Sequence, residues 1–426
     1  MSATSSAQQP VLIVGASARA AAFSALRAGF TPWCVDLFGD RDLARVATTR
    51  VIPPEDYPES FPALLEGFPP GPVLYAGGLE NWPGVVEALA RRWPLWGNSA
   101  ATLALARSPF HCHALLARAG LPRLLVREPS DPPSAGRWLL KPRSGAAGTG
   151  IRPWDGIPPS RRQRCYLQEF CPGEPHSALF LGDGKSALFL GLTRQLIGEI
   201  WLNAREFQYC GNIGPLPVSP QLRETLTAMG NVLAAGCNLR GLFGLDFMLA
   251  EGVPFLTEVN PRYTAAVEVL EYATGWPILA WHAGAFASRQ GKPSPLFRGR
   301  GENNPTPPSE TQRGEQTQSG TNALASASGR ESTAPPLVAK AIYYAVRDCV
   351  FPEDGPWLDA LHHENSWQLP AFADLSFPGT LHNEGQPVLS CLVRGESVET
   401  CLEQLRRVAS ELDAWFASAD LIWSER

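Results

Sequence analysis

Two neighbouring apolar segments within residues 244–262 carry acidic and amide residues at positions that strongly constrain the fold. The second segment alternates with period two, so Glu258 and Asn260 point to the same face of a predicted strand. A glycine and a proline separate the segments, which favours a tight antiparallel return. Asp246, twelve residues before Glu258, then lies opposite that face. We expect a β-hairpin on which these three oxygen-bearing side chains converge.

The chemistry of this predicted cluster suits a divalent cation. Magnesium takes few carboxylate ligands from proteins and fills its other positions with water and phosphate oxygens. Arg262, two residues beyond Asn260, would add charge that balances phosphates. The alternative is an ordinary strand face on which the acidic residues are solvated. One hairpin alone does not separate these two interpretations.

The composition favours small-molecule chemistry. The chain has 426 residues, 44% of them hydrophobic, which is enough for more than one core. Its net charge is −5, and it has no dense lysine and arginine stretch or long apolar run, so we expect no nucleic-acid partner and no membrane. The first residues lack the features of a signal peptide, and the nine cysteines include no C-x-x-C pair. Reduced thiols in a cytoplasmic protein are predicted.

The segment His111-Cys112-His113 has metal-binding residue types at close spacing. Positions i and i+2 of a helix point apart, and no second ligand cluster follows. We therefore expect no zinc at this segment.

The chain opens with a βαβ pattern. An apolar strand at residues 11–14 runs into Gly15 and an alanine-rich helix, and a second strand ends at Asp36. This pattern predicts a Rossmann-like domain, and Asp36 lies at the spacing of a ribose-binding carboxylate. Only the first of the three fingerprint glycines is present, however. We expect a domain that binds no NAD, with an NAD-dependent oxidoreductase as the alternative.

The next part of the chain contains a candidate phosphate site. One apolar-periodic helix is expected over residues 100–119, and a later strand ends at Lys141, just before the glycine-rich segment 145–150. Small residues let backbone N–H groups approach an anion, and the ammonium group adds a point charge. A glycine loop that joins an ordinary hairpin is the alternative.

A change of composition divides the rest of the chain. Residues 301–336 are rich in Pro, Gly, Ser, Thr, Asn and Gln and carry no aromatic residue, which predicts a disordered linker or loop. Strand patterns and an amphipathic helix that begins at Ser397 follow it and predict a small α+β domain. The expected divisions are a Rossmann-like domain at 1–100, a central domain at 101–295, the linker at 296–336 and a C-terminal domain at 337–426.

With these landmarks in order, the chain resembles the ATP-grasp superfamily, in particular the carboxylate-amine ligase branch that includes biotin carboxylase and the ATP-dependent purine-biosynthesis carboxylase. The likeness covers most of the chain. It rests on the Rossmann-like opening, the strand ending at Lys141 with its glycine segment, the hinge-like segment 168–173, and the acid-amide hairpin with Arg262. The resemblance implies an ATP-grasp fold of the α/β and α+β class, with an N-terminal pre-ATP-grasp domain.

The resemblance also implies roles for individual residues. Asp246, Glu258 and Asn260 correspond to ligands of one or two Mg²⁺ ions, with Mn²⁺ as an alternative ion. Lys141 corresponds to the lysine on the α- and β-phosphates, and Arg262 to the arginine that steadies the transferred phosphate or the substrate carboxylate.

Further matching residues would hold the nucleotide. The glycine segment corresponds to a mobile lid, the hinge to the adenine site, and a histidine after the hinge to a ribose contact, for which a surface histidine is the alternative. These residues are Gly145, Gly148 and Gly150 for the lid, the carboxylate of Glu169 and the backbone of Phe170 and Cys171 for adenine, and His176 for ribose.

The chain also departs from the family pattern. The family usually has a lysine or arginine early in the helix before the first phosphate strand, and Arg107 lies about two residues from that place. A surface helix residue is the alternative for Arg107. Arg194 and Arg205 fall where such enzymes recognise substrate, so both are candidates for anion binding.

The activity implied by the resemblance is a ligase reaction. A carboxylate attacks the γ-phosphate of ATP, and an amine or similar nucleophile opens the acyl phosphate. Positioning and charge neutralisation by Mg²⁺, Lys141 and Arg262 would supply most of the stabilisation. We expect small carboxylate and amine substrates, with a homodimer left open and pterin- or purine-related cofactor biosynthesis as the pathway. A nucleotide-binding protein without turnover is a further alternative.

Overall fold

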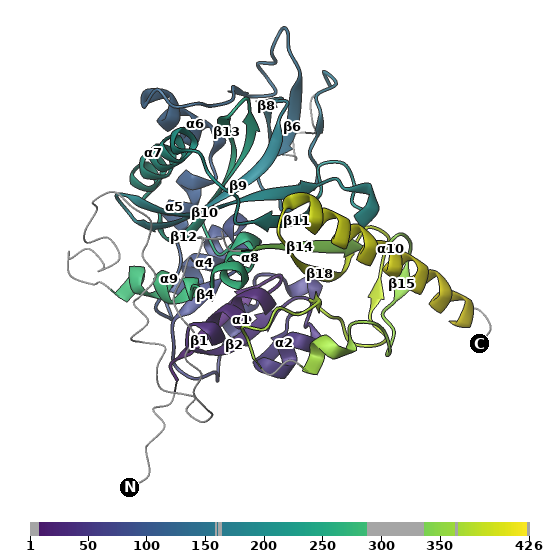
Figure 1. Cartoon of the computed structure of the whole chain (residues 1–426). Coiled ribbons are helices and arrows are strands. Elements are labelled where there is room, and N and C mark those ends of the chain that lie inside the picture. Colours follow the sequence, from purple (N-terminus) through teal and green to yellow (C-terminus); the bar gives the residue numbers. More distant parts are fainter. Residues whose placement is uncertain (1–7, 158–159, 161–163, 288–335, 363–364, 424–426) are drawn as a thin grey trace, which may run out of the picture.

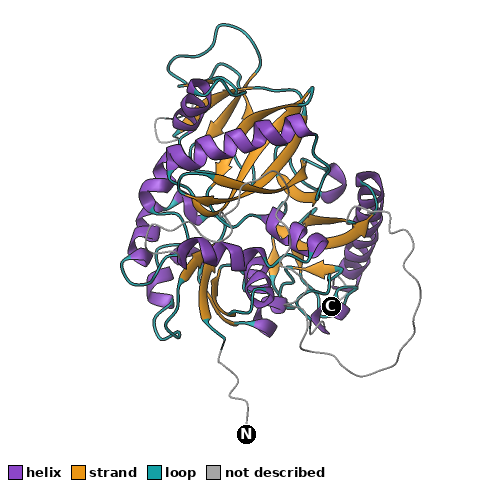
Figure 2. Cartoon of the chain, turned by 60° about the vertical axis from the view of Figure 1, so that its left-hand side comes forward, coloured by secondary structure: helices purple, strands orange, loops and turns teal. Residues whose placement is uncertain are grey.

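The computed structural model describes residues 8–157, 160, 164–287, 336–362 and 365–423. Of the predicted linker at 296–336, all but the last residue lies outside the described residues. Strands form three main sheets and one small ribbon, and helices lie against them (Figures 1 and 2). No helix in the described ranges combines the length and apolarity that crossing a bilayer requires.

The N-terminal sheet has four parallel strands in the order β3-β2-β1-β4. Its two long strands pair in the register that sets Gly15 opposite Asp36, so the βαβ prediction is confirmed. The order reverses between β1 and β4, and ligands bind at such a switch point in open α/β sheets. The elements are β1 (Pro10–Gly15), α1 (Arg19–Arg27), β2 (Thr31–Asp36), α2 (Arg41–Val46), β3 (Thr48–Val51), α3 (Phe61–Leu64), β4 (Val73–Tyr75) and α4 (Pro83–Ala90).

The helix expected over residues 100–119 is in fact two helices, α5 (Ala100–Ala106) and α6 (Pro109–Arg118). Ser108 is the N-cap of α6, and its hydroxyl accepts from the N–H of His111 at 3.3 Å. Proline is suited to a first helical turn and disrupts a helix interior. The expectation of one helix is therefore wrong, because apolar periodicity continued across a break that Ser108 and Pro109 encode.

A small antiparallel sheet follows, with the order β5-β8-β6-β7. Figure 1 shows β6 and β8 at the end of the molecule opposite β1 and β2. The strand that carries Lys141 is β6, as predicted. The strands are β5 (Val126–Arg127), β6 (Trp138–Pro142), β7 (Arg152–Pro153) and β8 (Cys165–Glu169).

The central sheet has eight strands in the order β13-β12-β9-β10-β11-β14-β18-β16. Helix α7 (Pro220–Cys237) packs on one face, over a core that includes Phe180 and Phe243. Helices α8 (Ala265–Thr274) and α9 (Ile278–Ala287) lie on the other face, between this sheet and α1. Its strands are β9 (Glu174–Asp183), β10 (Ala187–Ile197), β11 (Tyr209–Gly214), β12 (Arg240–Ala250), β13 (Val253–Asn260), β14 (Leu337–Tyr344), β16 (Phe372–Ala373) and β18 (Pro387–Gly395).

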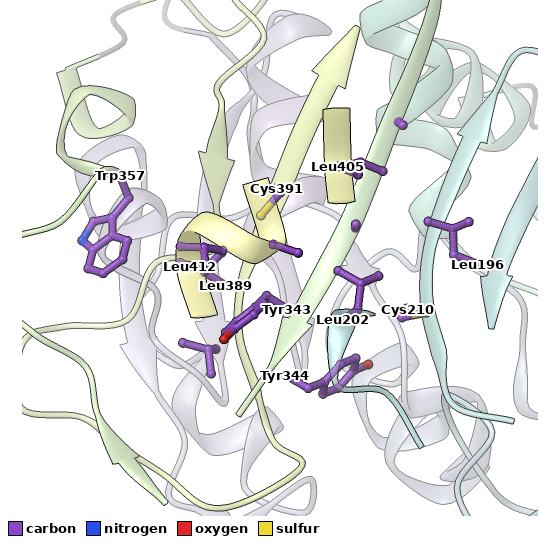
Figure 3. Packing of buried hydrophobic residues seen from close by; sticks show 14 of the residues in the cluster. Leu196, Leu202, Cys210, Tyr343, Tyr344, Trp357, Leu389, Cys391, Leu405 and Leu412 are labelled. Carbon is purple, nitrogen blue, oxygen red and sulfur yellow. The ribbon is translucent and has the colours of Figure 1, made fainter. Parts of the chain in front are cut away.

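The C-terminal segment shares this sheet, because β14 pairs antiparallel with β11. One core joins β10, β11, β14 and β18 to α10 (Val398–Trp423), and Figure 3 shows Leu196, Tyr343, Cys391 and Leu405 within it. The ribbon of β15 (Cys349–Val350) and β17 (Leu381–His382) lies beside them. The division predicted at residue 337 therefore marks a change of composition along the chain, while the sheet runs across it.

Candidate active site

The acid-amide hairpin forms as predicted. Strands β12 and β13 pair antiparallel, with Asp246 directly opposite Glu258 and a bulge just after Asp246. The side-chain amide of Asn260 donates to Asp246 Oδ2 at 2.7 Å. The two carboxylates and the amide therefore share one face of the sheet.

The two carboxylates differ in their electrostatics. Desolvation and then the neighbouring charge of Glu258 raise the pKa of Asp246 to about 6. Desolvation also opposes ionisation of Glu258, but the charges of Arg107 and Lys141 outweigh it and hold the pKa of Glu258 below its usual value. Two carboxylates that repel each other, next to an amide oxygen, fit a divalent cation.

Arg107 lies inside the site, so the surface-residue alternative for it is wrong. Its side chain is 12% exposed and forms an ion pair with Glu258. The same guanidinium donates to Asn81 Oδ1 at 3.2 Å and to the Gly145 carbonyl at 3.4 Å. Arg107 thus connects Glu258 to the first domain and to the glycine segment.

Lys141 is buried at the end of β6. Its Nζ donates to Gln168 Oε1 at 3.0 Å and to the Thr257 carbonyl at 3.3 Å. Strand pairing sets Lys141 opposite Tyr166, which brings both side chains and Gln168 to one face of the small sheet. The ammonium group therefore lies between the small sheet and β13.

The glycine segment packs closely against the start of β11. The N–H of Tyr209 donates to the Ala147 carbonyl at 3.1 Å, and the amide of Asn81 donates to the Gly145 carbonyl at 3.1 Å. Gly148 has φ +78°, and a Cβ there would clash with the Phe207 carbonyl oxygen. Only glycine allows this approach.

These groups surround one cavity between α6, the glycine segment and β13. The predicted residues that line this cavity are Lys141, Gly145, Gly148 and Glu258, and Arg107 lines it as well. Asn260, Arg262 and Gly150 are close in the chain to lining residues but are not among them, and Asp246 does not line the cavity either. The described lining residues do not include Glu169, Phe170, Cys171 or His176 either.

The hinge residues have protein partners. Glu169 Oε2 accepts from the Leu125 N–H at 3.0 Å, and the Phe170 N–H donates to the Arg137 carbonyl at 2.9 Å. Alternation along β8 turns Glu169 away from the face that holds Gln168. Cys171 follows the strand and is half-buried.

His176 is 3% exposed, so the surface-histidine alternative is wrong. Its ring stacks on Phe247, and its Nδ1 lies 3.0 Å from the Glu174 carbonyl. Ser177, the next residue, pairs with Asp246. Neighbouring strand positions face opposite ways, so His176 lies on the other side of the sheet from Asp246.

The three remaining arginines have distinct positions. Arg262 forms an ion pair with Glu80 of the first domain at 2.7 Å. Arg194 lies on the His176 side of the sheet, with its NH1 group 4.0 Å from Glu174. Arg205 donates to the Glu384 carbonyl at 3.4 Å, away from the cavity.

The face of the central sheet that carries Asp246 is polar over several strands. Pairing places Ser177 opposite Asp246 and Thr193 opposite Ser177, and it places Gln195 opposite Asn212. The Asn212 amide donates to Thr193 Oγ1 at 2.6 Å. A polar track, defined by these side chains and Lys340 opposite Asn212, therefore leads from the acids to the C-terminal strands.

Other predicted motifs serve the fold. The Asp36 carboxylate is buried and accepts from the N–H groups of Ala18 and Gly39, both at 2.5 Å, so the turns after β1 and β2 use both of its oxygens. The oxidoreductase alternative thus has no support in this site.

All nine cysteines are free thiols, and the described residues include no group of three or more His, Cys, Asp and Glu side chains that could hold a metal.

Three residues of this region had no assigned role in the sequence. The role of Gln168 could have been predicted from strand alternation, because Gln168 lies two residues after Tyr166, the partner of Lys141, and therefore on the same face of the small sheet. Glu80 and Asn81 follow the glycines after β4, but their contacts to Arg262 and Arg107 join residues far apart in sequence. No local pattern indicates such contacts.

Comparisons with known proteins agree with this geometry. Residues 112–266 match the family model of the ATP-grasp domain. The biotin carboxylase domain of 2-oxoglutarate carboxylase from Hydrogenobacter thermophilus, crystallised with MgADP, ADP and bicarbonate, is 13% identical, with a TM-score of 0.63, and the alignment covers 94% of this chain and 89% of that one. The L-amino acid ligase from Bacillus licheniformis is 13% identical, with a TM-score of 0.61 and coverages of 96% and 98%.

A curated relative is also found. An uncharacterised protein of Methanocaldococcus jannaschii is 25% identical over 138 residues. That alignment covers 31% of this chain and 32% of the relative, so the match spans about a third of the relative's length. Residues 112–266 therefore match the ATP-grasp domain, and the chain as a whole shares its fold with these solved structures.

Proposed function

We propose that this protein is an ATP- and Mg²⁺-dependent ligase that activates a carboxylate as an acyl phosphate and joins it to an amine or similar nucleophile. The observation that carries the proposal is the arrangement of Asp246 and Glu258 on paired strands, with Lys141 and Arg107 beside them and a glycine segment over the cavity. The match of residues 112–266 to the ATP-grasp domain and the fold shared with an L-amino acid ligase support it.

Asp246, Glu258 and Asn260 would hold the metal. Bound there, Mg²⁺ would neutralise phosphate oxygens and offset both the desolvation and the repulsion from Glu258 that raise the pKa of Asp246. Mn²⁺ has the same ligand preference and is the alternative ion.

Residues of the chain supply the remaining charge and the enclosure. Lys141 and Arg107 would bind the phosphate chain, since both cations line the cavity. The glycine segment would place its backbone over the phosphates and exclude water from the acyl phosphate. Arg262, fixed by Glu80, would bind the substrate end of the site.

The polar track supports an acceptor site on the Asp246 face of the sheet. Ser177, Thr193, Gln195 and Asn212 carry hydroxyl and amide groups there, on the face that α8 covers. Such groups form hydrogen bonds with an amine nucleophile and orient it for attack.

The test is ADP release from MgATP across a panel of carboxylates and amines that includes pterin- and purine-related compounds. Glu258→Gln should reduce release at least about a hundredfold, because it removes a ligand charge with little change of volume. Glu87→Gln, which alters an exposed ion pair on α4, is the matched control and should behave as wild type.

The outcomes separate the candidate functions. Near-normal turnover of Glu258→Gln would refute the metal assignment. Tight MgATP binding with no ADP release for any pair would favour a nucleotide-binding protein without turnover.

A further inference from the structure

Protein groups already bind both terminal nitrogens of the Arg107 guanidinium group. Its Nη1 forms the ion pair with Glu258 Oε1 and also donates to the Val259 carbonyl at 3.4 Å. Its Nη2 donates to Asn81 Oδ1 at 3.2 Å and to the Gly145 carbonyl at 3.4 Å. A phosphate oxygen can therefore bind a terminal nitrogen of Arg107 only where one of these contacts is given up or shared.

The predicted metal ligands have protein partners as well. Arg107 holds an oxygen of Glu258. The Asn260 amide donates to Asp246 Oδ2 at 2.7 Å, and Asn260 Oδ1 accepts from Arg262 at 3.3 Å. A divalent cation that binds these oxygens has to displace the donors. The displacement costs most at Glu258, because the donor there is a cation bound to a carboxylate.

The charged groups described for this site balance one another. Besides the pair of Arg107 with Glu258, Arg262 pairs with Glu80 at 2.7 Å. A divalent cation alone would add unbalanced positive charge to this set, whereas a cation that arrives with nucleotide phosphates brings its own counter-charge. The cations of the set are Arg107, Lys141 and Arg262, and its carboxylates are Glu80, Asp246 and Glu258.

The ion pair between Arg107 and Glu258 is open to the cavity. Both residues line the cavity, and the side chain of Glu258 is 37% exposed. Lys141 and the glycine segment line the same cavity. Phosphates that enter it therefore meet Arg107, Lys141 and the glycine segment together.

We propose that Arg107 gates the metal site. Its guanidinium group holds Glu258 until nucleotide phosphates replace that carboxylate, so the divalent cation binds together with the nucleotide and not before it. The exchange leaves Arg107 paired with phosphate and Glu258 paired with the cation, so both charges remain neutralised. This inference rests on the proposed function and adds the order in which metal and nucleotide bind. Arg107 is then a positioning residue for the metal as well as a phosphate ligand.

The test compares wild type with Arg107→Met, which removes the charge and keeps a long side chain. Isothermal titration calorimetry measures the binding of MnCl₂ alone and of preformed MnADP to the full chain. Wild type should bind MnADP at least about tenfold more tightly than Mn²⁺ alone. In Arg107→Met, Mn²⁺ alone should bind at least about tenfold more tightly than in wild type, and MnADP at least about tenfold more weakly. A variant that only disrupts the site would lose both affinities.

Two further variants control the result. The double variant Arg107→Met with Glu258→Gln should lose the gained affinity for Mn²⁺ alone, which places the gain at Glu258. Arg91→Met, which removes a cation from an exposed ion pair on α4, should bind both ligands as wild type does. Thermal unfolding of each variant checks that it is folded.

The outcomes separate this inference from the proposed function. Unchanged or weaker binding of Mn²⁺ alone to Arg107→Met, or a gain that persists in the double variant, would overturn the gate. Wild type that binds Mn²⁺ alone as tightly as MnADP would overturn it without any variant. Failure of wild type to bind MnADP at all would instead count against the proposed metal and nucleotide site itself.

Discussion

Single side chains of the site obtain their orientation from distant segments. Arg107 sits at the end of α5, yet its guanidinium is held by Glu258 and Asn81. Lys141 is held in the same way by Gln168. Protein contacts therefore hold each cation in place, and under the proposed function this would reduce the entropy lost when the phosphates bind.

The buried side chain of His282 makes the stability of the fold depend on pH. Its Nδ1 accepts from the Leu242 N–H at 2.8 Å, so its Nε2 carries the proton donated to the Trp96 carbonyl at 3.1 Å. Burial lowers the pKa of His282 from 6.5 to about 4. The folded protein thus keeps this ring neutral where the unfolded chain would protonate it.

His282 should stabilise the protein fully above pH 6.5, and this contribution should be lost as the pH falls towards 4. The shift corresponds to about 3 kcal/mol of unfolding free energy. Urea unfolding of wild type and His282→Asn at pH 7.5, 6 and 5 measures it. The difference between the two proteins should shrink as the pH falls, and parallel pH curves would contradict the expectation.

At the level of elements, the glycine segment 145–150 depends on close backbone packing. Its carbonyls accept from Asn81 and from the Tyr209 N–H, so the first domain and β11 both hold it. Gly148 lies where these contacts bring the backbones together. The segment can therefore close over the cavity only if this position has no side chain.

Gly148→Ala should keep the fold but displace the glycine segment, because the added Cβ clashes with the Phe207 carbonyl. ADP release should fall about a hundredfold, as expected when a positioning element is misplaced. Gly156→Ala is the matched control, since Gly156 has φ +82° with nothing within 4 Å of its Cβ position. Equal losses of turnover in both variants would point to backbone strain and not to lid packing.

Over the whole molecule, a buried ionic network ties together the first, central and C-terminal segments. Lys340 on β14 binds Glu268 of α8 at 2.9 Å and Asp374 at 2.8 Å. Arg19 of α1 binds the same Glu268 and also Asp42, at 2.8 Å from Asp42. The three segments are therefore joined by buried charges, while only the central and C-terminal segments share a sheet.

Lys340→Met should destabilise the whole protein by about 3–5 kcal/mol, because Glu268 and Asp374 lose a buried cation. Urea unfolding at neutral pH measures this loss. Arg407→Met, which removes one side of an exposed ion pair on α10, should change stability by less than about 1 kcal/mol. A wild-type midpoint for Lys340→Met would show that the network contributes little.

The sequence alone determined the elements whose patterns are local. Alternation and a turn predicted the hairpin that sets Asp246 opposite Glu258, and a strand followed by glycines predicted Lys141 beside a close-packed loop. The βαβ opening followed from the same kind of periodicity. Such patterns are readable because strand and helix geometry repeats every few residues.

Only the tertiary structure decided which side chains meet across the molecule. Arg107 with Glu258 and Glu80 with Arg262 each join residues from separate segments. The same packing carried the central sheet through the predicted C-terminal division. These contacts depend on how whole layers pack, and the periodicity of a single segment contains no information about its partner.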